Sequence, residues 1–261
     1  MERTMTVHEP MHDSTRDPAH DPAYDLAYDL ARDPLDLVSR AFRDRAVRWL
    51  GAEGGVRQYL DIGTRVPTEP GLHRVVQEAG PGSRVLHTGG EPLALRYAEA
   101  LLGGGSAAVT EYAQADARDP EAVVEAAGKV LDLGRPVALL LLARLHFISD
   151  EDGAYDLVRR LLEPLAPGSF LVLSHATGDF DRADRAGAEP EGAPYEQAAH
   201  ERWRPAPAAR SREEFARFFK GLELVEPGIT LAADWRPDPG GPVAAPGHDP
   251  VAGYVGVART L

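Results

Sequence analysis

The sequence predicts an α/β fold with a mostly parallel sheet and helices on both faces. Three observations lead to this fold class. Strand-like and helix-like segments alternate along most of the chain. Residues 137–142 and 170–173 are apolar at every position, as central parallel strands buried on both faces must be. Finally, a short strand ends in Asp61, Ile62 and Gly63 just before a helix, the layout of a nucleotide-binding turn.

The chain opens with a low-complexity segment. A four-residue repeat beginning with Asp runs from residue 17 to residue 36, and prolines at 18, 22 and 34 limit any helix there. We therefore expect residues 1–33 to form a flexible tail and residues 34–261 to form one domain. The tail is interpreted as a free or partner-docking segment, with an active-site lid as the alternative.

The elements of the domain follow in order. Pro34 suits the first position of a helix that ends at the glycines from Gly51 onward. Strands are then expected at 59–62, 84–88, 107–112, 137–142 and 169–174, and helices between them at 69–79, 92–102, 120–130 and 155–165.

The last third of the chain is more irregular. Residues 178–210 are rich in Gly, Ala, Pro and charge, and we expect a long excursion over the carboxyl edge of the sheet. Ser211 and Glu214 predict a capping box for a helix ending near Lys220. Two strands at 222–225 and 254–258 complete the sheet, and residues 234–250 connect them over the surface.

Composition excludes several classes of function. With 41 acidic and 28 basic residues, the net charge of −13 argues against nucleic-acid binding and favours a small-molecule substrate or a protein partner. No apolar run is long enough to cross a membrane or to act as a signal peptide, so we expect a cytoplasmic protein. Zero cysteines exclude thiolate catalysis, and no hydrolase, ATPase or metalloprotease motif occurs.

Two acids stand where doubly wound folds bind ligands. Asp61 and Asp116 lie at the carboxyl ends of predicted strands, and Gly63 and Thr64 open the turn after Asp61. The alternative is that both acids cap the helices that follow them. Asp119, beside Pro120, is interpreted as a simple helix cap.

Histidines at strand ends are the candidate catalytic bases. His146 and His175 project toward the same sheet edge, where either could accept a proton from a substrate. The alternative is a structural hydrogen-bonding role. These histidines and Asp179 lack the spacing of metal ligands, so no metal is expected.

Further residues are candidates for substrate binding. Arg65 and Arg144 could face one pocket and suit an anionic substrate, unless they pair with nearby acids. His87 ends the second strand. Tyr195 and Trp203 fall in the excursion, where they could either select the substrate or simply pack on the surface.

An ordered set of segments carries a resemblance to a known family. They are Arg-Ala-Phe at 40–42, Gln-Tyr-Leu-Asp-Ile-Gly-Thr at 58–64, Gln-Ala-Asp at 114–116, Leu-His-Phe at 145–147, Leu-Ser-His-Ala-Thr at 173–177 and Gly-Leu-Glu-Leu-Val-Glu-Pro-Gly at 221–228. The chain thereby resembles the class I methyltransferases, and more narrowly the actinobacterial S-adenosyl methyltransferases called the domain-of-unknown-function 574 family. The resemblance covers about residues 36–258.

The resemblance implies a Rossmann-like fold with a seven-stranded sheet that binds S-adenosylmethionine. The cofactor-binding residues would be Asp61, Gly63, Thr64, Glu91 and Asp116, with Asp116 meeting the adenine amino group. The sequence also departs from the family pattern. Arg65 replaces the last glycine of the turn, Gly89 stands where an acid usually binds the ribose, and an N-terminal Leu-Gly-Gly motif is absent.

Three functions are consistent with these observations. The first is methyl transfer (EC 2.1.1 type) from S-adenosylmethionine to a small molecule in secondary metabolism, by a protein that could form a homodimer. The second is a repurposed enzyme that uses the same pocket for a cofactor-free cyclisation, elimination or isomerisation. The third is a regulatory or scaffold protein that docks partners through its tail.

Overall fold

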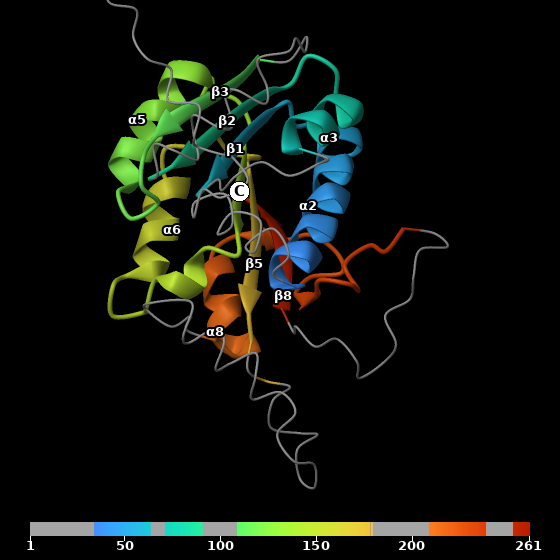
Figure 1. The fold of residues 1–261 in the computed structure, drawn as a ribbon, viewed down its shortest axis with the longest axis vertical. Coiled ribbons are helices and arrows are strands. Elements are labelled where there is room, and N and C mark those ends of the chain that lie inside the picture. Colours follow the sequence, from blue (N-terminus) through green and yellow to red (C-terminus); the bar gives the residue numbers. More distant parts are fainter. Residues whose placement is uncertain (1–33, 64–70, 91–108, 178, 180–208, 239–252) are drawn as a thin grey trace, which may run out of the picture.

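The computed structural model describes residues 34–63, 71–90, 109–177, 179, 209–238 and 253–261 (Figure 1). The predicted tail at 1–33, the predicted helix at 92–102 and almost all of the excursion at 178–210 lie outside these residues. The side chains of residues 34–38 are likewise not described.

A single sheet organises the described residues, in which it has eight strands (Figure 1). Its order is β3-β2-β1-β4-β5-β8-β6, and the short β7 also pairs with β8. The strands are β1 (Gln58–Ile62), β2 (Arg84–Gly89), β3 (Val109–Gln114), β4 (Ala138–Leu142), β5 (Phe170–Ala176), β6 (Glu223–Leu224), β7 (Thr230–Leu231) and β8 (Gly253–Arg259).

Strand direction agrees with the predicted fold class. β1 to β5 are mutually parallel, whereas β8 runs antiparallel to β5, β6 and β7. The seven strands of the main path were expected, and β7 was not, because a two-residue strand carries no periodic signal. The strand order reverses between β1 and β4, and doubly wound folds bind ligands at such a switch point.

Helices cover both faces of the sheet, as predicted (Figure 1). One face packs against α2 (Pro34–Ala52) and α3 (Leu72–Ala79). The other packs against α5 (Pro120–Val130), α6 (Ala154–Leu162), α8 (Arg212–Ala216) and the 3₁₀ turn η3 (Arg217–Phe219). A second 3₁₀ turn, η2 (Leu145–Phe147), follows β4.

The central strands explain why two cores form. In β4, Leu139 and Leu141 belong to the core under α5 and α6, while Ala138 and Leu140 belong to the core under α2 and α3. Because successive side chains of a strand point to opposite faces, a strand covered on both sides must be apolar throughout. The unbroken apolar run at 137–142 has this origin.

Two predicted helix caps are present. Asp119 accepts a hydrogen bond from the backbone N–H of Ala122 at 3.0 Å, and Pro120 follows it as the first residue of α5. Ser211 and Glu214 form the reciprocal capping box at the start of α8. The local sequence therefore sets both helix starts.

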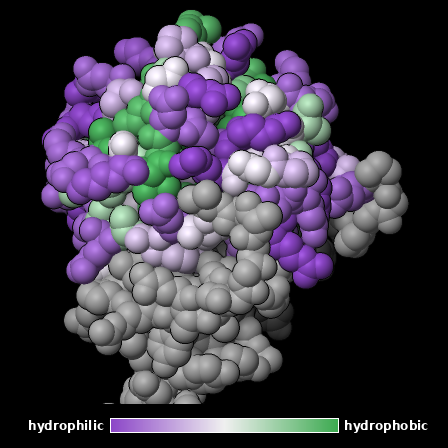
Figure 2. Space-filling view, turned by 90° about the horizontal axis from the view of Figure 1, so that it is seen from above, coloured by the Kyte–Doolittle hydropathy of each residue, from purple (hydrophilic) through white to green (hydrophobic). Residues whose placement is uncertain are grey.

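The described residues present a mainly polar surface on the face drawn in Figure 2. Hydrophilic side chains surround small hydrophobic groups on the face that Figure 2 shows. Leu224 and Leu261 are the large hydrophobic residues exposed in the described part of the chain. None of the described helices is long and apolar enough to span a membrane.

Candidate functional site at the carboxyl edge of the sheet

The turn after β1 is built on Gly63. Its φ of 80° lies in the left-handed region that favours glycine, and its backbone N–H donates to the carbonyl oxygen of Thr88 at 2.8 Å. The hydrogen bond ties the turn to the end of β2. The described part of the predicted nucleotide-binding turn is therefore tightly bent backbone at the β1/β4 switch point.

Asp116 lies beside a second glycine at the same edge. A β-carbon placed on Gly90 would come within 3.3 Å of Asp116 Oδ2, so the carboxylate lies close against that backbone. The other oxygen, Oδ1, accepts a hydrogen bond from the backbone N–H of Arg118 at 2.9 Å. Asp116 is exposed, and Asp119, rather than Asp116, caps α5.

Asp61 and His87 form a pair across the two neighbouring strands. They are register partners in β1 and β2, and Asp61 Oδ2 lies 2.9 Å from His87 Nδ1. The His87 ring also stacks on Tyr112 of β3, with centroids 4.7 Å apart and planes at 11°. The His87 side chain is buried and that of Asp61 is partly exposed, so the strand ends hold a carboxylate and an imidazole in fixed contact.

Arg144 reaches from the end of β4 to the turn after β1. The point at which Gly63 would carry a β-carbon lies 2.6 Å from Arg144 Cδ and 2.8 Å from Nε. The stem of the arginine therefore rests directly on the Gly63 backbone. This contact crosses the switch point and places a cation beside the glycine turn.

His175, on β5, has both ring nitrogens engaged. Nδ1 lies 2.7 Å from the carbonyl oxygen of Ala176, and since a carbonyl only accepts, Nδ1 carries the proton. Nε2 accepts a hydrogen bond from Arg210 Nη1 at 2.5 Å. Burial lowers the pKa of His175 from 6.5 to about 4, and the nearby Arg210 guanidinium acts in the same direction. His175 is thus a neutral imidazole at pH 7.

Arg210 is a buried arginine that connects the strand ends. Its guanidinium donates to Asp150 Oδ1 at 2.7 and 3.0 Å, to the carbonyl of Leu145 at 2.9 Å and to that of Ile148 at 2.8 Å. Its guanidinium carbon also lies 5.2 Å from the ring centroid of Phe218. Since Leu145 and Ile148 flank His146, Arg210 fixes the backbone on both sides of that histidine.

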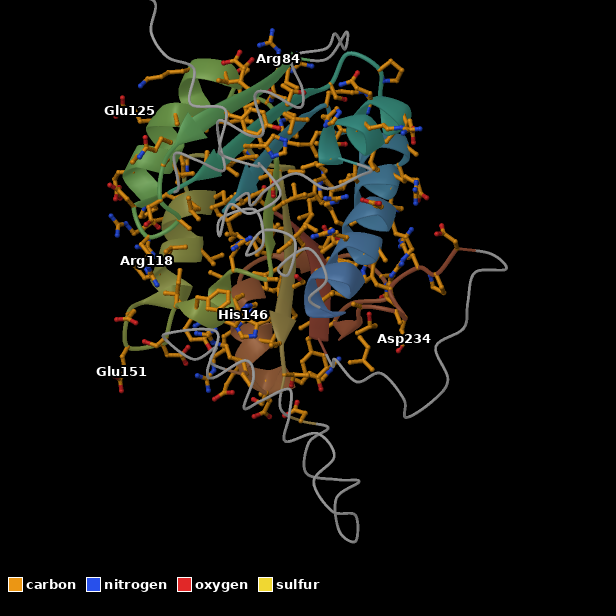
Figure 3. All side chains as sticks on the ribbon, viewed as in Figure 1. Arg84, Arg118, Glu125, His146, Glu151 and Asp234 are labelled. Atoms are coloured by element: carbon orange, nitrogen blue, oxygen red, sulfur yellow. The ribbon has the colours of Figure 1, made fainter. Side chains whose placement is uncertain are left out.

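His146 lies in η2, in the lower middle of the view and well away from Arg84 at the top (Figure 3). It is buried, and its ring meets that of His175 edge to face with centroids 5.7 Å apart. The two predicted bases therefore lie side by side.

The sequence analysis did not identify Arg210. It stands in a stretch rich in Pro, Ala and Arg, and its main partners are 35 and 60 residues away in the chain. Its position immediately before the predicted capping box is the one sequence feature that could have drawn attention to it.

The remaining predicted site residues divide into two groups. Thr64, Arg65, Glu91, Tyr195 and Trp203 lie outside the described residues. Asp179 is described, and its Oδ2 accepts hydrogen bonds from the backbone N–H of Arg212 and from the Tyr254 hydroxyl, each at 2.9 Å. Among the described residues, no group of three or more His, Asp or Glu side chains is arranged to hold a metal ion.

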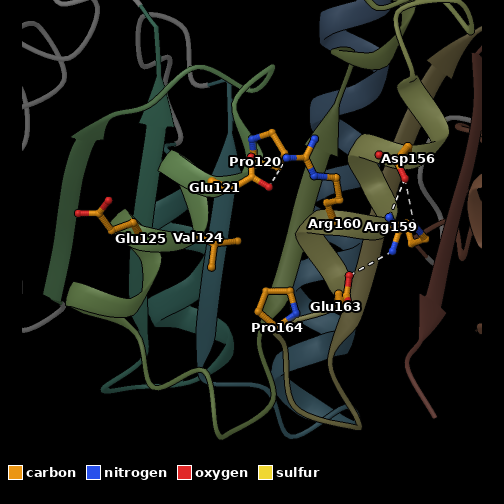
Figure 4. A pocket seen from close by; sticks show the side chains of 9 residues that line it. All are labelled: Pro120, Glu121, Val124, Glu125, Asp156, Arg159, Arg160, Glu163 and Pro164. Atoms are coloured by element: carbon orange, nitrogen blue, oxygen red, sulfur yellow. Dashed lines mark hydrogen bonds and ion pairs between the residues drawn. The ribbon is translucent and has the colours of Figure 1, made fainter.

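A surface groove of about 680 Å³ lies elsewhere, between α5 and α6 (Figure 4). Its polar lining includes the ion pairs of Glu121 with Arg160 and of Arg159 with Asp156 and Glu163. None of the described candidate residues lines it. We therefore place the candidate site at the sheet edge rather than in this groove.

Comparison with known proteins shows which family the chain resembles. Residues 31–261 match the family model described as S-adenosyl methyltransferase. A crystal structure of a DUF574 family protein from Streptomyces avermitilis MA-4680 is 38% identical, with a TM-score of 0.77 over 92% of this chain and 91% of that one. A candidate methyltransferase from Thermobifida fusca YX is 30% identical, with a TM-score of 0.72 over 91% and 86% of the two chains.

More distant structures share the fold. Magnesium protoporphyrin IX methyltransferase from Synechocystis PCC 6803, solved with bound S-adenosylhomocysteine, is 14% identical, with a TM-score of 0.53 over 91% of this chain and 94% of that one. At this identity the likeness concerns the fold alone. No curated protein matches the chain.

Proposed function

Because this chain belongs to the S-adenosyl methyltransferase family, we propose that it transfers a methyl group from S-adenosylmethionine to a small molecule. The observation that carries the proposal is the Gly63 turn at the β1/β4 switch point, together with a match to the family model over residues 31–261. Doubly wound folds bind nucleotide ligands at this place.

The described residues fit such a cofactor at Asp116, whose exposed carboxylate beside Gly90 suits the amino group of an adenine. At the Gly63 turn the stem of Arg144 lies against the backbone, so a bound ligand would lie beside that arginine. When bound, the cofactor would supply an electrophilic methyl group on its sulfonium. The protein would then need to align the acceptor and take up its proton.

We assign the proton-accepting role to His146. Both ring nitrogens of His175 are occupied, so the geometry favours His146 of the two predicted bases. Arg210 holds the backbone on each side of His146, which suits a group whose position matters. His175 and Arg210 would then act as positioning residues.

Calorimetric titration with S-adenosylmethionine and S-adenosylhomocysteine tests the proposal. We expect dissociation constants in the micromolar range, as for ordinary cofactors, and product inhibition of any methyl transfer by S-adenosylhomocysteine. No heat with either ligand at millimolar concentration would refute methyl transfer.

A cofactor-free enzyme of the same ancestry is the second candidate. It is favoured because side chains of the protein occupy the carboxyl edge of the sheet: His87 contacts Asp61, and Arg144 rests on Gly63. In that case the double substitution Arg65→Gly with Gly89→Asp should restore the family pattern and create cofactor binding. Tight binding by the unaltered protein would argue against this second candidate.

A further inference from the structure

Ala143 has an unusual backbone conformation at the end of β4. Its φ of 51° lies in the left-handed region, where residues other than glycine are rare. The residue is buried, and its N–H donates to Ser174 Oγ at 2.9 Å. The Ser174 hydroxyl in turn donates to Ser39 Oγ at 3.0 Å. Contacts from β5 and α2 therefore hold Ala143 in a conformation that it would not adopt on its own.

The bend at Ala143 sets the course of the next residue. Arg144 leaves the end of β4 and reaches the turn after the neighbouring β1, with Cδ and Nε at 2.6 and 2.8 Å from the position of a Gly63 β-carbon. Two left-handed backbone conformations, at Ala143 after β4 and at Gly63 after β1, thus lie at the ends of the two strands that meet at the switch point. Together they make room for one arginine stem.

An arginine held in this way has a specific chemical use. Its guanidinium is always charged, and its fork of N–H donors matches the two oxygens of a carboxylate. A phosphate would need several further donors for its larger charge, and the chain as a whole carries a net charge of −13. The site therefore favours a small anion with a single charge.

We infer that Arg144 forms a carboxylate-binding subsite across the β1/β4 switch point. The inference rests on the proposed function, because a ligand must occupy this edge. The carboxylate would come either from the aminoacyl end of the cofactor or from the methyl acceptor.

Two ligands that differ by one carboxylate test the cofactor as the source. They are S-adenosylhomocysteine and 5′-deoxy-5′-(3-aminopropylthio)adenosine, which lacks the carboxylate but keeps the amine. We expect Arg144→Gln to weaken binding of the first by about 10- to 100-fold and binding of the second by less than about 3-fold. Arg144→Lys should lie between wild type and Arg144→Gln, because it keeps the charge and loses the fork.

Benzoate and its neutral counterpart benzamide test the acceptor as the source. The midpoint temperature of thermal unfolding is measured with and without saturating S-adenosylhomocysteine. For the wild-type protein it should rise with millimolar benzoate and should not rise with benzamide. For Arg144→Gln it should not rise with benzoate either. Arg84→Gln is the matched control, since Arg84 starts β2, at the end of the strand away from the site, and its side chain bonds the Val130 carbonyl among the described contacts.

The outcomes separate the carboxylate subsite at Arg144 from the proposed methyl transfer. Loss of the carboxylate preference in either ligand pair, in Arg144→Gln but not in Arg84→Gln, supports the subsite and identifies its source. If wild type and Arg144→Gln respond alike to both pairs, the subsite is refuted while the proposed function stands. If wild type binds neither adenosine ligand, the proposed function fails, and benzoate alone then decides whether Arg144 binds a carboxylate.

Discussion

Asp61 Oδ2 lies 2.9 Å from His87 Nδ1, so the acid near the end of β1 is joined to its register partner in β2. We predict that Asp61→Ala lowers the free energy of unfolding by about 1–3 kcal/mol, because it leaves a buried imidazole N–H without its acceptor. Asp61→Asn should recover much of this loss, since its amide oxygen can still accept. Urea denaturation measures both.

The exposed pair of Arg74 and Glu78 provides the control for this substitution. Glu78→Ala should cost less than about 1 kcal/mol, because solvent screens the pair. A cost for Asp61→Ala no larger than that of Glu78→Ala would show that the contact with His87 does not stabilise the fold.

Gly63 should not tolerate a side chain, for two separable reasons. Its φ is positive, and a β-carbon would lie 2.6 Å from Arg144 Cδ. Gly153 has nearly the same φ, 81°, with no atom within 4 Å of its β-carbon position, so Gly153→Ala isolates the backbone term of about 1–2 kcal/mol. We expect Gly63→Ala to cost about 1–3 kcal/mol more, from overpacking.

Removing the Arg144 side chain should remove the additional cost of Gly63→Ala. In an Arg144→Ala background, Gly63→Ala should cost no more than Gly153→Ala does. Chemical denaturation of the single and double variants gives the coupling directly. Independent, additive effects of Gly63→Ala and Arg144→Ala would contradict the observed packing.

Arg210 should be among the most sensitive positions in the chain. Arg210→Ala leaves the Leu145 and Ile148 carbonyls, Asp150 and His175 without their donor, and we predict a loss of about 2–4 kcal/mol in the free energy of unfolding. Arg159 also pairs with two acids, but on an exposed helix surface where solvent screens the charges, so Arg159→Ala should cost far less stability than Arg210→Ala. Equal losses in the two variants would be incompatible with a connecting role for Arg210.

The difference between Asp119 and Arg210 shows what could be predicted from the sequence. Asp119 caps a helix that starts at the next residue, so four residues of sequence contain the whole interaction. The alternating strands and helices are local in the same sense, and the predicted fold class is confirmed. Arg210 bonds Asp150 and His175 only because folding brings β5, η2 and the segment before α8 together.

The candidate site was predictable to the extent that it depends on strand ends. The hydrophobic pattern reveals the strands, and the structure places the candidate residues at or just after their carboxyl ends: Asp61, Asp116, Arg144, His146 and His175. The direct contact of Arg144 with Gly63 was not predictable, because it depends on the order of β1 and β4 in the sheet and on the bend at Ala143.

The pH dependence of stability should report the burial of His175. Its pKa is about 4 in the folded protein and 6.5 in the unfolded chain, so the unfolded state binds an extra proton between these values. The free energy of unfolding should therefore fall as the pH drops from 6.5 to 4, by up to about 3 kcal/mol, and this contribution stays constant below pH 4.

His175→Gln should reduce that pH dependence, because glutamine does not titrate. Urea denaturation at several pH values compares the two slopes, with Arg210 and Asp150, the charged groups nearest the ring, unchanged in both proteins. Parallel curves for wild type and variant would mean that His175 protonates equally easily in the folded and unfolded states.

Asp116 and Asp119 allow binding and stability to be separated within four residues of sequence. If the exposed Asp116 carboxylate binds the adenine amino group, Asp116→Ala should weaken S-adenosylhomocysteine binding by about 10-fold, with little change in stability. Asp119→Ala removes the cap of α5 and should cost about 1 kcal/mol of stability with unchanged affinity. Calorimetry and denaturation of both variants test the two assignments, and an affinity loss confined to Asp119→Ala would reverse them.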